Sequence, residues 1–174
     1  MRDYYAAYEG QASGFGLLPT ELPNLPAGSR FDDVATPPMR AVRNLARAFA
    51  GSVALERSDP LGVEVASLGP ESKVFEGDAA HPPLWHREVL AVLPFQITPR
   101  RHAVAVYVMT RDAVRPLPPA TFRLTFSGVK GSRVEAVDVM SGEPLDVRAE
   151  PLAADRLDVV LPVTEKPVVL TIGP

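Results

Sequence analysis

The sequence predicts a mainly β protein: an Ig-like antiparallel β-sandwich of about 8–9 strands, preceded by one amphipathic α-helix and an irregular N-terminal arm. From about Val63 onward, apolar and polar residues alternate in short runs separated by turn-forming residues. The 19 prolines also argue against long helices. Because the pattern changes near residue 55, we expect an arm and helix over residues 1–55 and a sandwich over residues 56–174.

The N-terminal arm shows no periodicity. It carries Tyr4, Tyr5 and Tyr8, several glycines and then the spaced prolines of LLPTELPNLPAGSR, which favour an extended path. A stretch of this length without periodicity is uncommon inside a compact domain. We therefore expect the arm to lie on another surface, or its partner to be missing from this chain. The residues after Met1 also lack the apolar segment of a signal peptide.

One helix is predicted over TPPMRAVRNLARAFAG. Thr36 can cap it, two prolines fit its first turn, and Gly51 can end it in a left-handed conformation. Three- and four-residue spacings create an apolar stripe, opposite a face of arginines. Because such a stripe must pack on something, we predict that it contacts another domain. The predicted interdomain residues are Met39, Val42, Leu45 and Phe49.

The strands are recognised by a period of two. FRLTF places Phe122, Leu124 and Phe126 on one face, and AVAVYVMT is apolar on both faces, as a central strand would be. In RVEAVDVM the alternation breaks at residues 136–137, which indicates a bulge or a covered second face. Ser141-Gly142 forms a predicted hairpin turn. The candidate strands are 62–67, 72–76, 88–97, 102–110, 121–127, 133–139, 145–150, 156–161 and 168–172.

Composition excludes several classes of function. The chain has 18 Lys and Arg residues and 21 Asp and Glu residues, so its net charge is −3. It therefore has no excess of basic residues to neutralise the phosphates of a nucleic acid. The lack of cysteine excludes thiol catalysis, disulfides and cysteine-ligated metals, but leaves the compartment open. The longest apolar runs fall far below the ~20 residues of a membrane helix. We therefore expect a soluble protein that binds neither nucleic acid nor membrane.

The segment DAAHPPLWHREVLAVLPFQ holds the only tryptophan, Trp85, and two of the three histidines, His81 and His86. Two histidines five residues apart do not match the four-residue spacing of zinc helices, so no metal site is predicted. Trp85 could stack on a sugar together with His81, His86 and Tyr107. The favoured interpretation is that Trp85 covers one end of the sandwich core, because large aromatic residues are mostly buried.

No motif marks a catalytic centre. The carboxylates are scattered, no serine lies in a G-x-S-x-G elbow, and no glycine-rich segment has the form of a phosphate loop. We therefore predict no catalytic residue and no cofactor.

A family resemblance covers most of the chain. VEAVDVMSGEPLDV and DRLDVVLPVTEKPVVLTI resemble the closing strands of the β-sandwich that follows the catalytic (β/α)8 barrel in many glycoside hydrolases. An Asp precedes a Ser-Gly hairpin, here Asp138, Ser141 and Gly142, and a final strand runs from Leu161 to Ile172. The helix PPMRAVRNLARAFAG is similar to the last barrel helix.

The resemblance implies a non-catalytic accessory sandwich from the C-terminal end of a glycoside hydrolase. A barrel takes ~250 residues, more than this chain contains, so the barrel is the expected partner and its catalytic carboxylates lie elsewhere. The expected role is support of the barrel by packing, without activity of the chain alone. Two alternatives stay open: a carbohydrate-binding module that uses Trp85, and a structural sandwich that acts through protein contacts.

Overall fold

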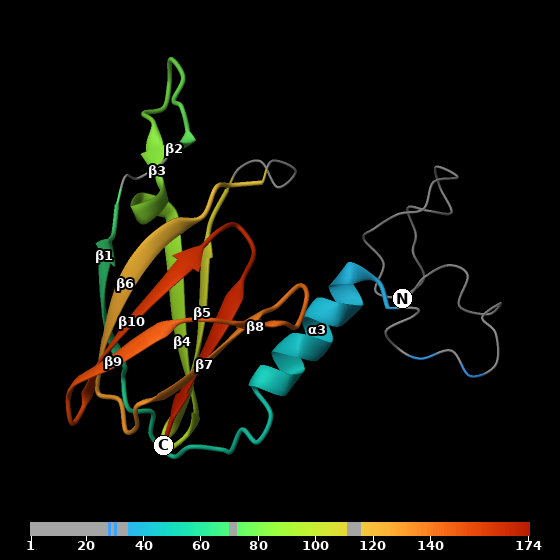
Figure 1. Ribbon diagram of the computed structural model, residues 1–174, viewed down its shortest axis with the longest axis vertical. Helices are drawn as coiled ribbons and strands as arrows, with labels where there is room; N and C mark the ends of the chain where they lie inside the picture. The colour runs from blue at the N-terminus through green and yellow to red at the C-terminus, as the bar shows by residue number, and fades with distance from the viewer. Residues whose placement is uncertain (1–27, 29, 31–34, 70–72, 111–115) are drawn as a thin grey trace.

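The computed structural model describes residues 28, 30, 35–69, 73–110 and 116–174, so most of the predicted N-terminal arm lies outside the described residues. Two antiparallel sheets lie face to face, with one helix beside them (Figure 1). The four-stranded sheet has the order β1 (Gly62–Ser67), β6 (Ala120–Ser127), β10 (Arg156–Val163), β9 (Arg148–Ala153). The five-stranded sheet has the order β4 (Leu90–Thr98), β5 (Arg101–Val108), β11 (Val168–Gly173), β7 (Arg133–Asp138), β8 (Pro144–Leu145).

The expectation of a mainly β sandwich preceded by one helix is confirmed, and its Ig-like character stays a prediction. The candidate strand 145–150 divides into β8 and β9, which belong to different sheets. β3 (Leu84–Trp85) was not predicted, because two residues are too few to show a period. It pairs with β2 (Lys73–Phe75) in a hairpin that projects beyond one end of the sandwich (Figure 1).

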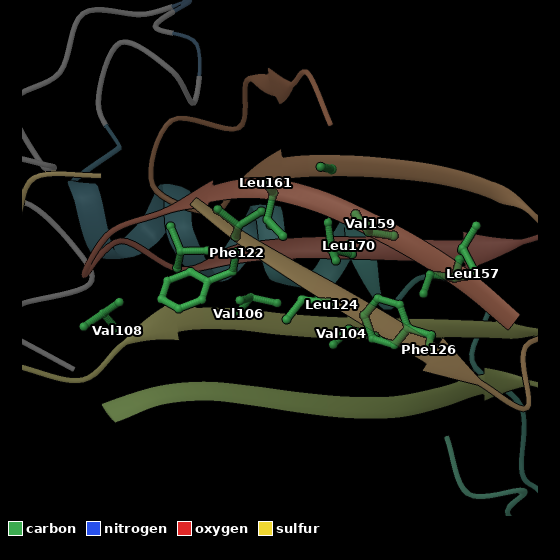
Figure 2. Close-up of a cluster of buried hydrophobic side chains, with 14 of the residues drawn as sticks. Val104, Val106, Val108, Phe122, Leu124, Phe126, Leu157, Val159, Leu161 and Leu170 are labelled. Atoms are coloured by element: carbon green, nitrogen blue, oxygen red, sulfur yellow. The ribbon is translucent and has the colours of Figure 1, made fainter. Parts of the chain in front are cut away.

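The core lies between the two sheets. Phe122, Leu124 and Phe126 of β6 are completely buried. Val104 and Val106 of β5 lie opposite them in the same apolar cluster (Figure 2). Alternate residues of a strand point to opposite faces of the sheet. The apolar residues that recur at every second position therefore all face the core and form this buried layer.

β7 contains no bulge. Its register with β11 is continuous from Arg133↔Gly173 to Asp138↔Val168. Ala136 belongs to the inter-sheet core, and Val137 lines a hollow beside the helix on the opposite face. The alternation therefore breaks because the second face of the sheet is covered, which was the other interpretation of this segment.

The helix α3 (Pro37–Ala48) begins as the sequence predicts. The Thr36 hydroxyl accepts a hydrogen bond from the Met39 N–H at 3.4 Å, and Pro37 and Pro38 occupy the first turn. After the helix, Gly51 adopts the predicted left-handed conformation with a φ of 77°. Within the described residues, no helix is long and apolar enough to cross a membrane.

The helix packs on the outer face of the five-stranded sheet. Small side chains make this contact: Ala41 and Ala48 of the helix meet Ala103 of β5 and Val169 of β11. Asn44, only 5% exposed, faces the β7–β8 turn, where its Nδ2 donates a 2.9 Å hydrogen bond to the Val139 carbonyl. Small residues let the helix approach the sheet closely, and Phe49 is the member of the predicted apolar stripe that joins this contact.

The turn between β7 and β8 forms as predicted and also holds the helix. Asp138 Oδ1 accepts hydrogen bonds from the N–H groups of Met140 and Ser141 at 2.7 and 2.9 Å. Gly142 has a φ of 81°, and a Cβ atom there would lie 2.9 Å from Nδ2 of Asn44. Glycine is therefore required both by the backbone conformation and by the approach of the helix.

Candidate functional site

Trp85 does not cover the end of the core, so that prediction is wrong. Its side chain stands on the projecting β2–β3 hairpin and is 37% exposed, and Lys73 Nζ lies 5.6 Å from its ring centroid. A short 3-10 helix, η2 (His86–Val89), follows directly, and Glu88 Oε2 accepts a 2.9 Å hydrogen bond from the Trp85 N–H. This abrupt turn directs Trp85 outward and buries His86 completely.

His81 lies in the loop of the same hairpin. Its Nδ1 is 2.9 Å from Asp78 Oδ1, and the same carboxylate oxygen accepts hydrogen bonds from the N–H groups of Ala80 and His81, both at 2.8 Å. These contacts close an Asx-type turn. Residues 76–83 border a wide, open hollow of about 490 Å³. The polar groups at its rim thus hold the loop's own backbone.

The four residues suggested as a sugar platform do not form one surface. Trp85 and His81 are exposed on the hairpin, but His86 is fully buried and has no face to offer a ligand. Tyr107 is half-buried on β5 beside Ala91, in the set of β5 residues that points away from the core. Lys73 also occupies a position over the Trp85 ring where a sugar would stack.

A second polar cluster lies at the other end of the sandwich. Lys130 Nζ pairs with Asp59 Oδ2, and this hydrogen bond lowers the pKa of Asp59. The Asp59 N–H donates to Gln96 Oε1 at 2.8 Å, and the neighbouring His102 is 2% exposed. Burial lowers the pKa of His102 below its ordinary value. These contacts fasten the linker that runs from α3 to β1 under the sandwich.

The structure groups no metal ligands in the part of the chain that it describes, where no three His, Asp or Glu side chains converge on one point. Neither histidine of the Trp85 segment meets the second and third ligands that a zinc site would need. His81 has one carboxylate neighbour, and His86 is enclosed by the protein.

The most extensive candidate is an apolar surface formed by α3 and the edge strand β4, which we call the docking face. Its four members expose large hydrophobic side chains: Val42 is 54% exposed, Leu45 36%, Leu93 43% and Phe95 45%. Phe49 joins the helix to the strand, because its ring lies 5.3 Å from the Phe95 ring in an edge-to-face contact.

The sheet leaves the docking face uncovered because of the residues beside it. Leu93 pairs with Ala105 and Phe95 with Ala103, so no large side chain of β5 shields them. β4 is also the edge strand of its sheet. Along α3, Leu45 lies one turn before Phe49, and Val42 lies three residues before Leu45. The four exposed side chains therefore adjoin one another through Phe49.

The predicted interdomain stripe and the docking face overlap in part. Val42 and Leu45 belong to both, while Met39 and Phe49 are half-buried. Sequence reasoning missed Leu93 and Phe95. Their signal was present in LAVLPF, which is apolar on both faces, but recognising it required knowing that β4 is an edge strand.

No known protein family, curated protein sequence or solved structure matches this chain. The docking face, the hairpin and the Asp59 cluster are therefore interpreted from their own geometry.

Proposed function

We propose that this chain is a non-catalytic accessory β-sandwich of a glycoside hydrolase, and that it supports the catalytic domain by packing against it through the docking face. The exposed apolar docking face carries the proposal. Contiguous exposed apolar patches on a soluble domain commonly mark a contact with another protein surface. The resemblance of the C-terminal strands to the sandwiches of barrel glycosidases supplies the identity of the partner.

The energy available at this surface suits a contact between domains. Completely burying one large apolar side chain contributes about 1.5–3 kcal/mol. The four members of the docking face expose between 36% and 54% of their surface, so covering the remainder contributes about 1 kcal/mol each, or about 4 kcal/mol together. This gain is sufficient for a contact within one polypeptide, where little rotational and translational freedom is lost. A complex of two separate chains loses that freedom and needs contacts beyond these four side chains.

The position of the helix also supports an interdomain role. α3 uses its alanines for its own sheet and leaves Val42 and Leu45 outward. A helix that served only its own domain would be expected to turn its apolar stripe inward. This arrangement supports a contact of α3 with a second domain.

The test is to co-express the chain with the protein encoded immediately upstream of Met1 and to measure the mass of the purified product by analytical ultracentrifugation. A complex with a barrel protein is expected, and it should hydrolyse aryl glycosides, while the purified chain alone should not. Val42→Asp combined with Leu45→Asp should dissociate the complex, because two carboxylates would have to be buried.

The matched control is Leu152→Asp on β9, because Leu152 is 51% exposed but lies on the other sheet. This variant should leave the complex intact. Hydrolysis of aryl glycosides by the chain alone would overturn the non-catalytic role. A complex that survives the double substitution would overturn the role of the docking face.

A further inference from the structure

A small hollow lies between the C-terminal part of α3 and the outer face of the five-stranded sheet. Its volume is about 200 Å³, and its polar lining includes Arg47, Arg101, Glu135 and Thr171. We propose that this hollow binds a small carboxylate that also carries hydroxyl groups. The site involves none of the four members of the docking face and does not depend on the proposed accessory role.

The sheet register brings these side chains together. Thr171 of β11 pairs with Glu135 of β7 on one side and with Ala103 of β5 on the other. Ala103 itself is fully buried beneath α3. In the next row Gly173 pairs with Arg133, and a Cβ atom at Gly173 would lie 3.7 Å from Cγ of Arg101. Among the residues that line the smaller hollow, Ala48 and Gly142 are small and stand between larger polar side chains.

A second hollow adjoins the first and shares part of its lining. This second hollow of about 280 Å³ shares Arg101, Glu135 and Thr171 and extends to Arg133 and the chain end at Pro174. Arg133 and Glu135 form a 2.6 Å ion pair, so the Glu135 charge is already balanced. The smaller hollow is the more enclosed part and is the one we assign to the ligand.

The charge of the smaller hollow favours an anion. Arg101 donates hydrogen bonds to the carbonyls of Ala48 and Ala50 at 3.2 and 3.0 Å, which fixes its guanidinium at the end of α3. These two bonds use two of its five N–H donors. Among the described residues, neither Arg101 nor Arg47 forms an ion pair. Two cationic groups thus face a hollow whose single carboxylate is paired with Arg133.

The remaining lining favours a hydroxylated carboxylate over phosphate. Guanidinium groups bind carboxylates through paired, charge-assisted hydrogen bonds. The Thr171 hydroxyl and the free oxygen of Glu135 can accept hydrogen bonds from ligand hydroxyls, and Val137 and Val169 offer an apolar floor for its carbon skeleton.

The size of the hollow limits the ligand. Pockets for drug-sized molecules begin at roughly 300 Å³, so a hollow of about 200 Å³ admits a smaller compound. We therefore choose glucuronate as the probe, with glucose as a neutral compound of similar size and inorganic phosphate as a non-carboxylate anion.

The experiment is an NMR titration of the purified chain, in which the backbone amide signals of Thr171 and Glu135 are followed. Glucuronate should shift these signals with saturation, glucose should not, and phosphate should act more weakly. Arg47→Gln should weaken glucuronate binding by about tenfold or more, the loss of one charge-assisted hydrogen bond. Arg47 is preferred over Arg101 because Arg101 also stabilises the helix end.

Arg57→Gln is the matched control, because it removes the same charge at an exposed residue outside the hollow. This variant should bind glucuronate as the unchanged chain does. Equal weakening by both substitutions, or equal shifts by glucuronate and phosphate, would show general charge attraction and overturn the site. An absence of shifts throughout the titration would also overturn it, without bearing on the accessory role.

Discussion

Replacing Asn44 by alanine should destabilise the protein, because Asn44 is a buried polar link between α3 and the sandwich. Its side chain is 5% exposed, and its Nδ2 donates a 2.9 Å hydrogen bond to the carbonyl of Val139, itself 3% exposed. The substitution leaves that carbonyl buried without its donor, at a cost of about 1–3 kcal/mol. Alanine also has a higher helix propensity than asparagine, which returns about 0.5 kcal/mol. We expect a net loss of about 1–2 kcal/mol.

Urea unfolding followed by circular dichroism measures this change, since a small domain is expected to unfold in one transition. The midpoint should fall without a change in slope. Asn44→Asp should cost more at neutral pH, because an ionised carboxylate cannot donate and faces the Val139 carbonyl, and part of the loss should return below about pH 4. Arg47→Ala, at an exposed position of the same helix, serves as the propensity control. An Asn44→Ala variant as stable as the unchanged chain would refute the link.

Three further substitutions test other parts of the structure. Burial lowers the pKa of His102, so the unfolded chain binds a proton at this residue more tightly than the folded protein does. The free energy of unfolding should therefore be highest above about pH 6.5 and should decrease as the pH falls below that value. Urea midpoints across this range should show the decrease, and His102→Gln should make it smaller. Gly142→Ala should cost about 1–2 kcal/mol, because φ is 81° and the new Cβ meets Asn44; a smaller change in calorimetry would argue against the tight turn. Trp85→Ala should change stability by less than about 1 kcal/mol and leave retention on a polysaccharide panel unaltered, whereas lost retention would favour the carbohydrate-binding alternative.

The strands and the helix could be predicted because their signals are local. FRLTF carries its faces in the order of its residues and forms β6 with the expected side inward. AVAVYVMT, apolar on both faces, forms β5, which is an interior strand of its sheet. Thr36 and Gly51 likewise act within a few residues of the helix ends. The segment HPPLWHREV misled because a two-residue strand and a single turn of 3-10 helix have no period to detect.

The candidate sites could be predicted only in part. The apolar stripe of α3 was visible in the sequence, and the prediction that it contacts another domain remains to be tested. Leu93 and Phe95 join it only because the fold makes β4 an edge strand beside α3. The hollow of Arg47, Arg101, Glu135 and Thr171 draws on four elements that are far apart in the chain. No spacing in the sequence indicates such a grouping.

The features that could be predicted and those that could not differ in the distance along the chain over which their causes act. Backbone geometry and side-chain alternation act over a few residues, so composition and periodicity were sufficient for the class of the fold, the helix and most strands. Burial depends on which strand ends at an edge and which helix face meets the sheet, and these follow from packing between segments distant in sequence. That packing placed Ala41 and Ala48 against the sheet, with Phe49 as the one member of the apolar stripe beside them, and left Val42 and Leu45 outward. It also enclosed His86 while leaving Trp85 exposed.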